Sequence, residues 1–267
     1  MRKASIKSKR DIELLRESGR ILVEALLEVA KLAEKAVETK ITASDLDRKA
    51  IEIIDKNKAK PSFYGYTAGV GEPGFPGALC VSLNNEIVHG LPTKEKIIQE
   101  GDLLKIDLGV EYKNLFTDAA ITVPIGNVSK EAMELARTTR KCLELGLDQI
   151  YPGSTLGNYG NAIEKYALGK GYGVVRNLVG HGVGYAVHEP PQIPNFGKPG
   201  KGLVLEEGMV LALEPMINLG TGEIELGEDG FAFVTGDGKI SSHFEVTVAV
   251  VKKGHQVLTN WIDKINL

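Results

Sequence analysis

Residues 103–123, LLKIDLGVEYKNLFTDAAITV, decide the fold class, because two apolar, β-branched runs flank a short polar centre. This pattern predicts a β-hairpin. Asp107 and Asp118 interrupt the two runs, where an ionised carboxylate is costly unless it is paired or bound to a metal. A turn centred between Tyr112 and Lys113 would make the two aspartates direct cross-strand partners, with Cβ atoms roughly 5 Å apart. Like charges at that distance repel, and a shared divalent cation is the simplest remedy.

The second half of the chain repeats this anomaly. Glu214 follows the apolar run MVLAL and Glu245 lies within HFEVTVAV, so the pattern places both in strands at positions that favour apolar side chains. His181 lies between glycines in GHGVGYAVHEPPQ, residues 180–192. Four acids and one imidazole suit two divalent ions that share carboxylates and leave positions open for water and substrate. The pattern favours metal-assisted hydrolysis of an amide or a phosphate, and the competing interpretation is unrelated acids with their own ion pairs.

The other histidines have separate interpretations. His188 and His89 lie beside glycine-containing or apolar runs and are candidates for proton transfer or substrate contact. The competing interpretation of His188 is an ordinary loop histidine. His243 is expected to support the site or the core rather than bind metal, and His255, in KKGHQ, is expected in an exposed turn.

Composition excludes several function classes. The 267 residues carry 32 Lys and Arg against 35 Asp and Glu, and a net charge of -3 provides no overall field for nucleic acid or anionic lipid. The basic start MRKASIKSKR is followed by a charged run, which is unlike a signal peptide, and no apolar run is long enough to span a membrane. Two cysteines fit a reducing compartment, so we expect a soluble protein of the cytoplasm.

Helical and strand patterns follow the same order in both halves. An apolar stripe predicts a helix over about residues 11–35, and Thr42 with Asp45 forms the capping box of a second. Further helices are expected to begin at Ser129 and near Ser154. We expect an α+β fold of two similar halves packed around one core, with a site between them. The expected organisation is a short basic extension at 1–10 and one catalytic domain at 11–267, with halves at about 11–125 and 126–260.

Five motifs resemble those of the methionine aminopeptidases of peptidase family M24: NEIVHG, KIDLG with an aspartate eleven residues on, GHGVGYAVHEPP, LALEPM and SSHFEVTV. The resemblance covers nearly the whole chain, from IKSKRDIELLRESGRI onward. It implies the pita-bread fold, in which helices cover a curved antiparallel sheet and two pseudo-symmetric halves enclose a dinuclear metal site. His188 and Glu214 are 26 residues apart, which resembles the type I branch because type II enzymes carry a long insertion there.

The resemblance implies a role for each ligand. Two divalent metal ions, for which Co, Mn, Fe, Zn and Ni are all suitable, would be held by Asp107, Asp118, His181, Glu214 and Glu245. By the same resemblance Asp107 is bidentate to one ion, and Asp118 and Glu245 bridge the pair. Glu214 is also implied to be the general base for the attacking water.

The resemblance also implies which residues contact the substrate. His89 and His188 would contact the scissile amide nitrogen and the carbonyl oxygen without binding metal. The pocket for the methionine side chain would consist of Phe63, Tyr66, Phe75, Cys80 and Phe231. The chain departs from the family pattern in three places: Phe231 stands where many relatives carry Trp, the loop at 67–74 is longer, and Val246 stands where a polar residue is common.

The implied activity is removal of the initiator methionine from nascent chains when the second residue is small. Methionine is flexible and apolar, so a dry aromatic and sulfur-lined pocket would select it by burial. The implied partners are N-terminal Met-Xaa peptides, with a transient ribosome contact, no membrane, no specific nucleic acid and a monomeric enzyme. Two alternatives are an Xaa-Pro peptidase of the same fold, which usually has an additional N-terminal domain, and a non-catalytic pita-bread module that binds protein or RNA.

Overall fold

The structure is a computed structural model that describes residues 4–67, 73–265 and 267. Within these residues lie the helices α1 (Lys9–Glu34), α2 (Ala43–Lys56), α3 (Lys130–Leu147) and α4 (Leu156–Gly169), with short 3-10 turns at Lys35–Val37 and Ile262–Lys264. Ser8 and Thr42 begin α1 and α2 with capping boxes, which pair N–H groups that a first helical turn leaves free. Ser129 caps α3 in the same manner, without the reciprocal partner. The four predicted helices are confirmed.

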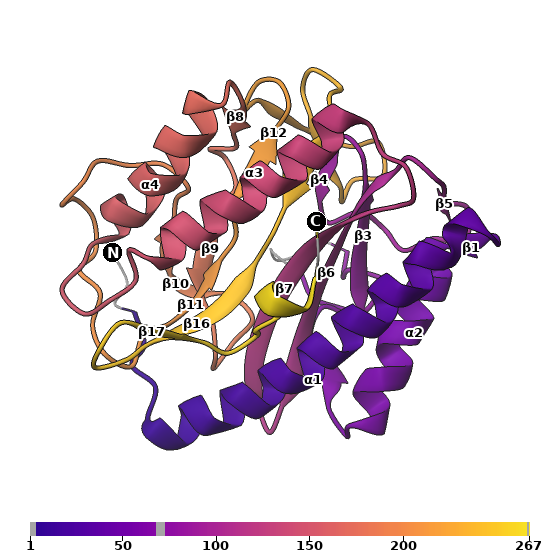
Figure 1. The fold of residues 1–267 in the computed structure, drawn as a ribbon. Coiled ribbons are helices and arrows are strands. Elements are labelled where there is room, and N and C mark those ends of the chain that lie inside the picture. Colours follow the sequence, from indigo (N-terminus) through magenta and orange to yellow (C-terminus); the bar gives the residue numbers. More distant parts are fainter. Residues whose placement is uncertain (1–3, 68–72, 266) are drawn as a thin grey trace.

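An antiparallel sheet forms the first half of the chain. Its strands are β2 (Lys60–Pro61), β3 (Leu79–Leu83), β6 (Leu103–Tyr112) and β7 (Leu115–Pro124). The central strand is β6, because β7 pairs along its whole length on one edge while β3 and β2 pair on the other. The long α1 packs across β6 and β7 with α2 beside it (Figure 1), so the apolar stripe of α1 is buried on this sheet.

The hairpin is confirmed, but its predicted register is wrong. Lys113 and Asn114 form the turn with φ of 54° and 62°, so the turn centre lies one residue later than expected. A two-residue hairpin turn with positive φ at both positions matches the twist of the strands, and Asn tolerates that conformation well. As a result Asp107 lies opposite Ala120, and Asp118 lies opposite a glycine. The aspartates are diagonal neighbours on one face of the hairpin rather than direct partners.

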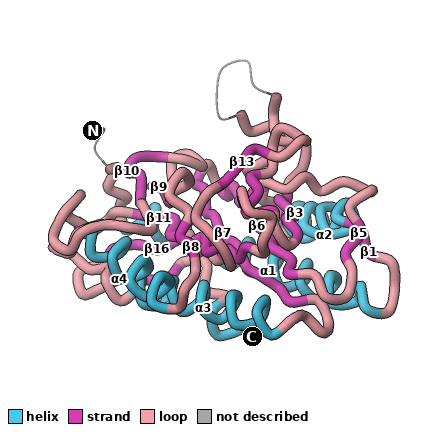
Figure 2. Tube along the Cα trace, turned by 90° about the horizontal axis from the view of Figure 1, so that it is seen from above, coloured by secondary structure: helices cyan, strands magenta, loops and turns pink. Residues whose placement is uncertain are grey.

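The second half contributes a five-stranded sheet in the order β10-β9-β11-β16-β17. Its strands are β9 (Gly180–Gly182), β10 (Glu189–Ile193), β11 (Val210–Leu213), β16 (Val246–Val250) and β17 (His255–Val257). Three small sheets complete the described part of the fold. The first has the order β15-β12-β8, with β8 (Gly173–Val174), β12 (Met216–Asn218) and β15 (Ser241–His243). The second has the order β13-β14-β4, with β4 (Glu86–Val88), β13 (Ile224–Leu226) and β14 (Phe233–Thr235), and the third pairs β1 (Ile41–Thr42) with β5 (Ile97–Ile98). Figure 2 shows the helices along one side of the strand layer.

Glu214 and Glu245 lie at breaks between strands, not inside strands as the pattern predicts. Glu214 separates β11 from β12, and Glu245 separates β15 from β16. The two strand pairs on either side keep one continuous register, which would set Glu214 opposite Glu245. Pro215 interrupts the ladder here because it has no N–H to donate. Both carboxylates therefore project from a gap in the sheet.

A seam between β7 and β16 joins the two halves. Ala120 and Glu245 exchange two backbone hydrogen bonds, with N···O distances of 2.8 and 3.3 Å. Beside them the Thr247 hydroxyl accepts from the Asp118 N–H at 2.9 Å and donates to the Asp118 carbonyl oxygen at 2.7 Å. One apolar core extends through both halves beneath this seam. The α+β fold with antiparallel sheets is confirmed.

No helix in the described part of the chain combines the length and the apolar character that a membrane crossing requires.

Candidate metal centre

Elements from both halves bring the predicted ligands together at the seam. The predicted ligands are Asp107 on β6, Asp118 on β7, His181 on β9, Glu214 directly after β11 and Glu245 directly before β16. In the second half, His181 lies opposite Ala212, two residues before Glu214, so the imidazole and the carboxylate share a face of the sheet. The same diagonal relation holds between the two aspartates of the first half.

The ligand atoms form overlapping groups. One oxygen each from Asp107, Asp118 and Glu245 lie within 4.8 Å of one another, and so do atoms of His181, Glu214 and Glu245. A third group of this size joins Asp118, His181 and His188. Asp118, His181 and Glu245 each belong to two of these groups, so the three groups overlap in one centre.

The carboxylates are buried without a protein cation. One oxygen each of Asp107, Asp118 and Glu245 has no hydrogen-bond partner, and these side chains belong to residues at most 8% exposed. Among the residues that the structure describes, no lysine or arginine forms an ion pair with them or with Glu214. Burial raises the pKa of Asp107 to about 7, and burial with neighbouring carboxylates raises the pKa values of Asp118 and Glu245 well above their usual range. Such acids hold protons unless cations replace them, so this donor set fits divalent ions.

His181 has the protonation state that a metal ligand needs. Its Nδ1 lies 2.9 Å from the carbonyl oxygen of Gly182, so this nitrogen carries the proton and donates. Its Nε2 faces the acids, 3.7 Å from Glu214 Oε1 and 3.9 Å from Asp118 Oδ2. Burial lowers the pKa of the imidazole to about 4, so the ring is neutral near pH 7. A neutral ring with a free Nε2 is ready to bind a metal ion.

His188 lies beside this cluster and is open to solvent. Its ring centroid is 4.3 Å from that of His181, with the two planes 68° apart. Its Nδ1 lies 2.5 Å from the phenolic oxygen of Tyr66. When the Tyr66 hydroxyl donates to Nδ1, the proton of the neutral ring is on Nε2, which then becomes a donor. The side chain of His188 is exposed whereas His181 is buried, so an incoming molecule reaches His188 first.

His89 and His243 flank the cluster. His89 directly follows β4 with φ of 60°, a left-handed conformation that residues other than glycine seldom adopt and that concentrates at functional sites. Its exposed ring packs edge-on against Phe233, with centroids 5.8 Å apart. His243 is buried, with Nε2 3.7 Å from Glu214 Oε2, and burial, followed by the nearby His89, lowers its pKa to about 3. His243 therefore contacts a predicted ligand as a neutral ring.

His255 differs from its prediction. It lies in β17, is half-buried, and its Nδ1 is 3.1 Å from the carbonyl oxygen of Ile150. The KKGHQ pattern indicates a turn, but the residues after Gly254 pair with β16 and so extend the sheet.

The residues predicted for the methionine pocket belong to one apolar cluster: Phe63, Phe75 and Cys80 are buried, and Tyr66 and Phe231 are partly buried. Phe75 and Phe231 pack edge to face with centroids 5.9 Å apart. Cys80 lies opposite Asp107 across β3 and β6, so the cluster borders the carboxylates. Burial raises the pKa of the Cys80 thiol, which therefore remains a small neutral group.

The same cluster contains residues that the sequence analysis missed: Val187, Leu91 and Phe116. Val187 could have been predicted because it directly precedes the candidate His188. Nothing in the sequence around Leu91 or Phe116 indicates that they belong to this cluster. Two predictions fall partly outside the described residues, namely the long loop, at 68–72, and the basic extension, at Arg2 and Lys3.

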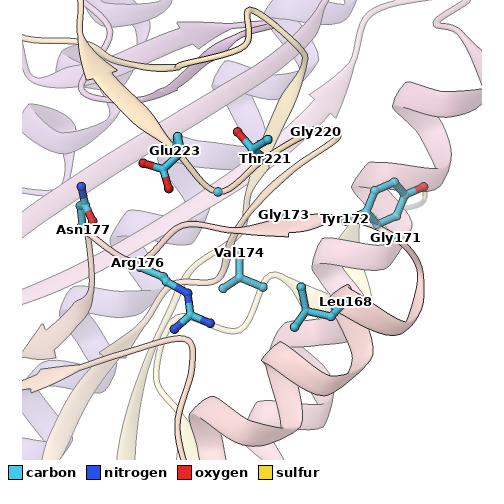
Figure 3. Close-up of a pocket in the computed structure, with 11 residues that line it drawn as sticks. Leu168, Gly171, Tyr172, Gly173, Val174, Arg176, Asn177, Gly220, Thr221 and Glu223 are labelled. Carbon is cyan, nitrogen blue, oxygen red and sulfur yellow. The ribbon is translucent and has the colours of Figure 1, made fainter.

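A cavity of about 440 Å³ lies elsewhere, between the end of α4, β8 and residues 220–223 (Figure 3). None of the predicted site residues lines it. Its one guanidinium, on Arg176, already pairs with Glu164 and stacks on the ring of Phe196. The cavity therefore offers no chemistry comparable to the carboxylate cluster.

Comparisons with known proteins relate nearly the whole chain to one family. The family described as "Metallopeptidase family M24" matches residues 13–252. A protein of Clostridium perfringens (strain 13 / Type A) named "Methionine aminopeptidase" is 42% identical over 254 residues, which cover 95% of this chain and 98% of that protein. The crystal structure of methionine aminopeptidase from Thermotoga maritima has a TM-score of 0.90 at 41% identity and covers 96% of this chain and 99% of its own. The prolidase from Pyrococcus furiosus has a TM-score of 0.74 at 22% identity, with 65% of its length covered, and shares the fold alone.

Proposed function

The chain belongs to metallopeptidase family M24 and has the pita-bread fold, and we propose that the carboxylate and histidine cluster at its seam is where it cleaves its substrate. The activity is metal-dependent removal of N-terminal methionine, as a methionine aminopeptidase. One observation supports the location above all others. Buried carboxylates without a protein cation lie directly beside an apolar cluster of aromatic rings and one thiol.

In this proposal Asp107, Asp118, His181, Glu214 and Glu245 would hold two divalent ions. The assignment is supported by the two groups of atoms within 4.8 Å of one another that these five residues form, Asp107 with Asp118 and Glu245, and His181 with Glu214 and Glu245. When bound, the ions lower the pKa of a water molecule and polarise the substrate carbonyl. Glu214 takes a proton from the attacking water and passes it to the leaving amine. The backbone carbonyl of Glu214 accepts a hydrogen bond from Asn195 at 2.9 Å, which holds this segment in place.

The two exposed histidines contact the scissile peptide in this proposal. His188 donates from Nε2 to the carbonyl oxygen, because the Tyr66 hydroxyl occupies Nδ1. His89 contacts the amide nitrogen that becomes the new N-terminus. The strained backbone of His89 supports a functional role, since a residue with a Cβ keeps a left-handed φ only where surrounding contacts enforce it.

Selection of methionine is assigned to the apolar cluster around Phe75. An unbranched thioether fills irregular space between aromatic rings, and sulfur makes favourable contacts with their edges. The cluster supplies Phe63, Tyr66, Phe75, Cys80 and Phe231 for this purpose. A narrow adjoining subsite would admit only a small second residue.

The cellular setting forms a further part of the proposal. Nascent chains are the source of initiator methionine, so the substrates are their N-terminal Met-Xaa ends, reached by transient contact with the ribosome in the cytoplasm. The enzyme acts as a monomeric single domain of the type I branch. The type I assignment is supported by the short span between His188 and Glu214, which leaves no room for a large insertion.

A metal-reconstitution assay tests the activity against its alternatives. Chelator-stripped protein is reloaded separately with Mn, Fe, Co, Zn or Ni and assayed on Met-Ala-Ser and on an Xaa-Pro peptide. We expect release of methionine from Met-Ala-Ser in at least one metal form and none in the stripped protein. Cleavage of the Xaa-Pro peptide alone would instead identify an Xaa-Pro peptidase, and inactivity in every metal form would favour a non-catalytic binding module.

A further inference from the structure

The segment before α1 packs against the loop at residues 184–188, here called the His188 loop. The backbone N–H of Lys7 donates to the carbonyl oxygen of Gly208 at 2.8 Å. The Lys7 side chain is only 1% exposed, and its Nζ lies 2.8 Å from Glu189 Oε2. The Ser5 hydroxyl contacts both charged groups. Glu189 directly follows His188 in the chain, so this buried ion pair lies at the C-terminal end of the His188 loop.

Glu189 holds the His188 loop with its second carboxylate oxygen. This oxygen, Oε1, accepts hydrogen bonds from the backbone N–H groups of Tyr185 and Ala186. The Lys7 ammonium lies 5.1 Å from the centroid of the Tyr185 ring, and the Tyr185 hydroxyl donates to Asp11 in α1 at 2.9 Å. One carboxylate thus connects the N-terminal segment to the backbone of the loop.

The start of the loop is equally constrained. Gly184 has φ of 136°, and a Cβ at this position would lie 2.5 Å from the Cε atom of Lys7. Glycine therefore allows the lysine side chain to lie flat against the loop. On the other side, the N–H of Phe116 in β7 donates to the Gly184 carbonyl oxygen at 2.8 Å. The loop is held between β7 and the N-terminal segment.

A buried ion pair contributes little net stability, because desolvation of the two charges offsets their attraction. Its effect here is geometric, since the ammonium and two N–H groups all converge on one carboxylate. We propose that Lys7 and Glu189 are positioning residues that hold His188 in place beside His181 and Tyr66. This inference rests on the proposed contact of His188 with the substrate carbonyl.

The test uses Lys7→Met, Glu189→Gln and the double variant in the full-length, metal-loaded enzyme with Met-Ala-Ser as substrate. Lys7→Met leaves the Glu189 carboxylate buried without its partner, and the loop shifts to reach water. We expect kcat to fall about ten- to a hundredfold, the size of effect that a misplacement of about 1 Å produces. The metal Kd, measured by titration calorimetry, should not change. Lys9→Met removes an exposed lysine two residues further on, at the first residue of α1, and should leave kcat unchanged.

A His188→Ala background separates positioning from a general loss of structure. If Lys7 acts through His188, Lys7→Met has no further effect on kcat in that background. An equal loss in both backgrounds, a weaker metal Kd or an unchanged kcat would each overturn the inference. If Lys7→Met does not fold, the double variant Lys7→Met/Glu189→Gln replaces it, because this variant is neutral and close to the wild type in shape. Its kcat is then compared with and without His188→Ala. Failure of the proposed function is distinguishable, because the wild type would then release no methionine.

Discussion

Removal of the metal ions should uncover a pH dependence of stability that originates in the carboxylate cluster. Burial raises the pKa of Asp107 from 3.8 to about 7. Between these values the folded state retains a proton that the unfolded state has released, so the free energy of unfolding falls as the pH rises. The stabilising contribution is complete below pH 3.8 and is lost as the pH passes about 7. For Asp107 alone it amounts to on the order of 4 kcal/mol.

Asp107→Asn removes this contribution, because an amide is neutral at every pH, and it also removes the repulsion by which Asp107 raises the pKa values of Asp118, Glu214 and Glu245. The measurement is urea unfolding of chelator-stripped wild type and variant at about pH 5, 6, 7 and 8. The free energy of unfolding of the variant minus that of the wild type should increase by about 3 kcal/mol between pH 5 and pH 8, because roughly two of the three pH units that separate the two pKa values lie in this range. Added Mn²⁺ should stabilise the wild type more at high pH than at low pH, since metal and protons compete for the same oxygens. Asp55→Asn, an exposed position on α2, should retain the wild-type pH dependence.

A difference between the wild type and Asp107→Asn that stays constant over this pH range would refute the reasoning. Asp107 would then be ionised in the folded, metal-free protein, and a neighbouring group would have to neutralise it. The same pH series with Mn²⁺ shows whether metal binding itself depends on the cluster, because a variant without the carboxylate should gain little stability from the ion.

Three further predictions concern individual residues. His181→Ala should weaken metal binding by more than about tenfold, measured by titration calorimetry, because it removes the one nitrogen ligand; an unchanged Kd would exclude His181 from the ligand set. His188→Ala should retain two ions per chain, counted by elemental analysis, while kcat falls about 10²- to 10³-fold, and loss of an ion would assign His188 to the metal instead. Phe75→Ala should lower the free energy of unfolding by about 3–5 kcal/mol and raise KM for Met-Ala-Ser, because it empties a buried position in the apolar cluster. Tyr64→Ala changes an exposed position nearby and should do neither. An unchanged KM in Phe75→Ala would place the methionine pocket elsewhere.

Local sequence patterns, namely capping residues and apolar stripes, were sufficient to predict the helices. Ser8 and Thr42 cap α1 and α2 with side chains three residues from their partners, and the apolar stripes repeat within a few turns. The strands were harder to delimit. Glu214 and Glu245 continue apolar runs in the sequence, yet each lies in a break, because Pro215 removes a donor and Glu245 pairs with β7 instead.

The residues of the candidate site could be named from the sequence, whereas their geometry could not. Carboxylates within apolar runs indicate a metal centre wherever they finally lie, since burial without a cation is costly. The distances between them depend on the hairpin turn at Lys113 and Asn114, whose positive φ values shifted the register away from the expected one. A shift of this kind is decided by the twist of the paired strands rather than by alternation of residue types.

The sequence by itself determined the helices and the hairpin, and it named the acids and the histidine as candidate ligands. The aromatic candidates beside them came from the family resemblance. Only the tertiary structure decided that β7 and β16 pair through Ala120 and Glu245, which brings ligands from both halves within 4.8 Å. It alone connected Lys7 to Glu189, across 182 residues of chain. The physical reason is that the spacing of apolar residues indicates which face of a helix or strand is buried. Contacts between distant segments depend on backbone hydrogen bonds and charge pairs, which produce no repeating pattern in the sequence.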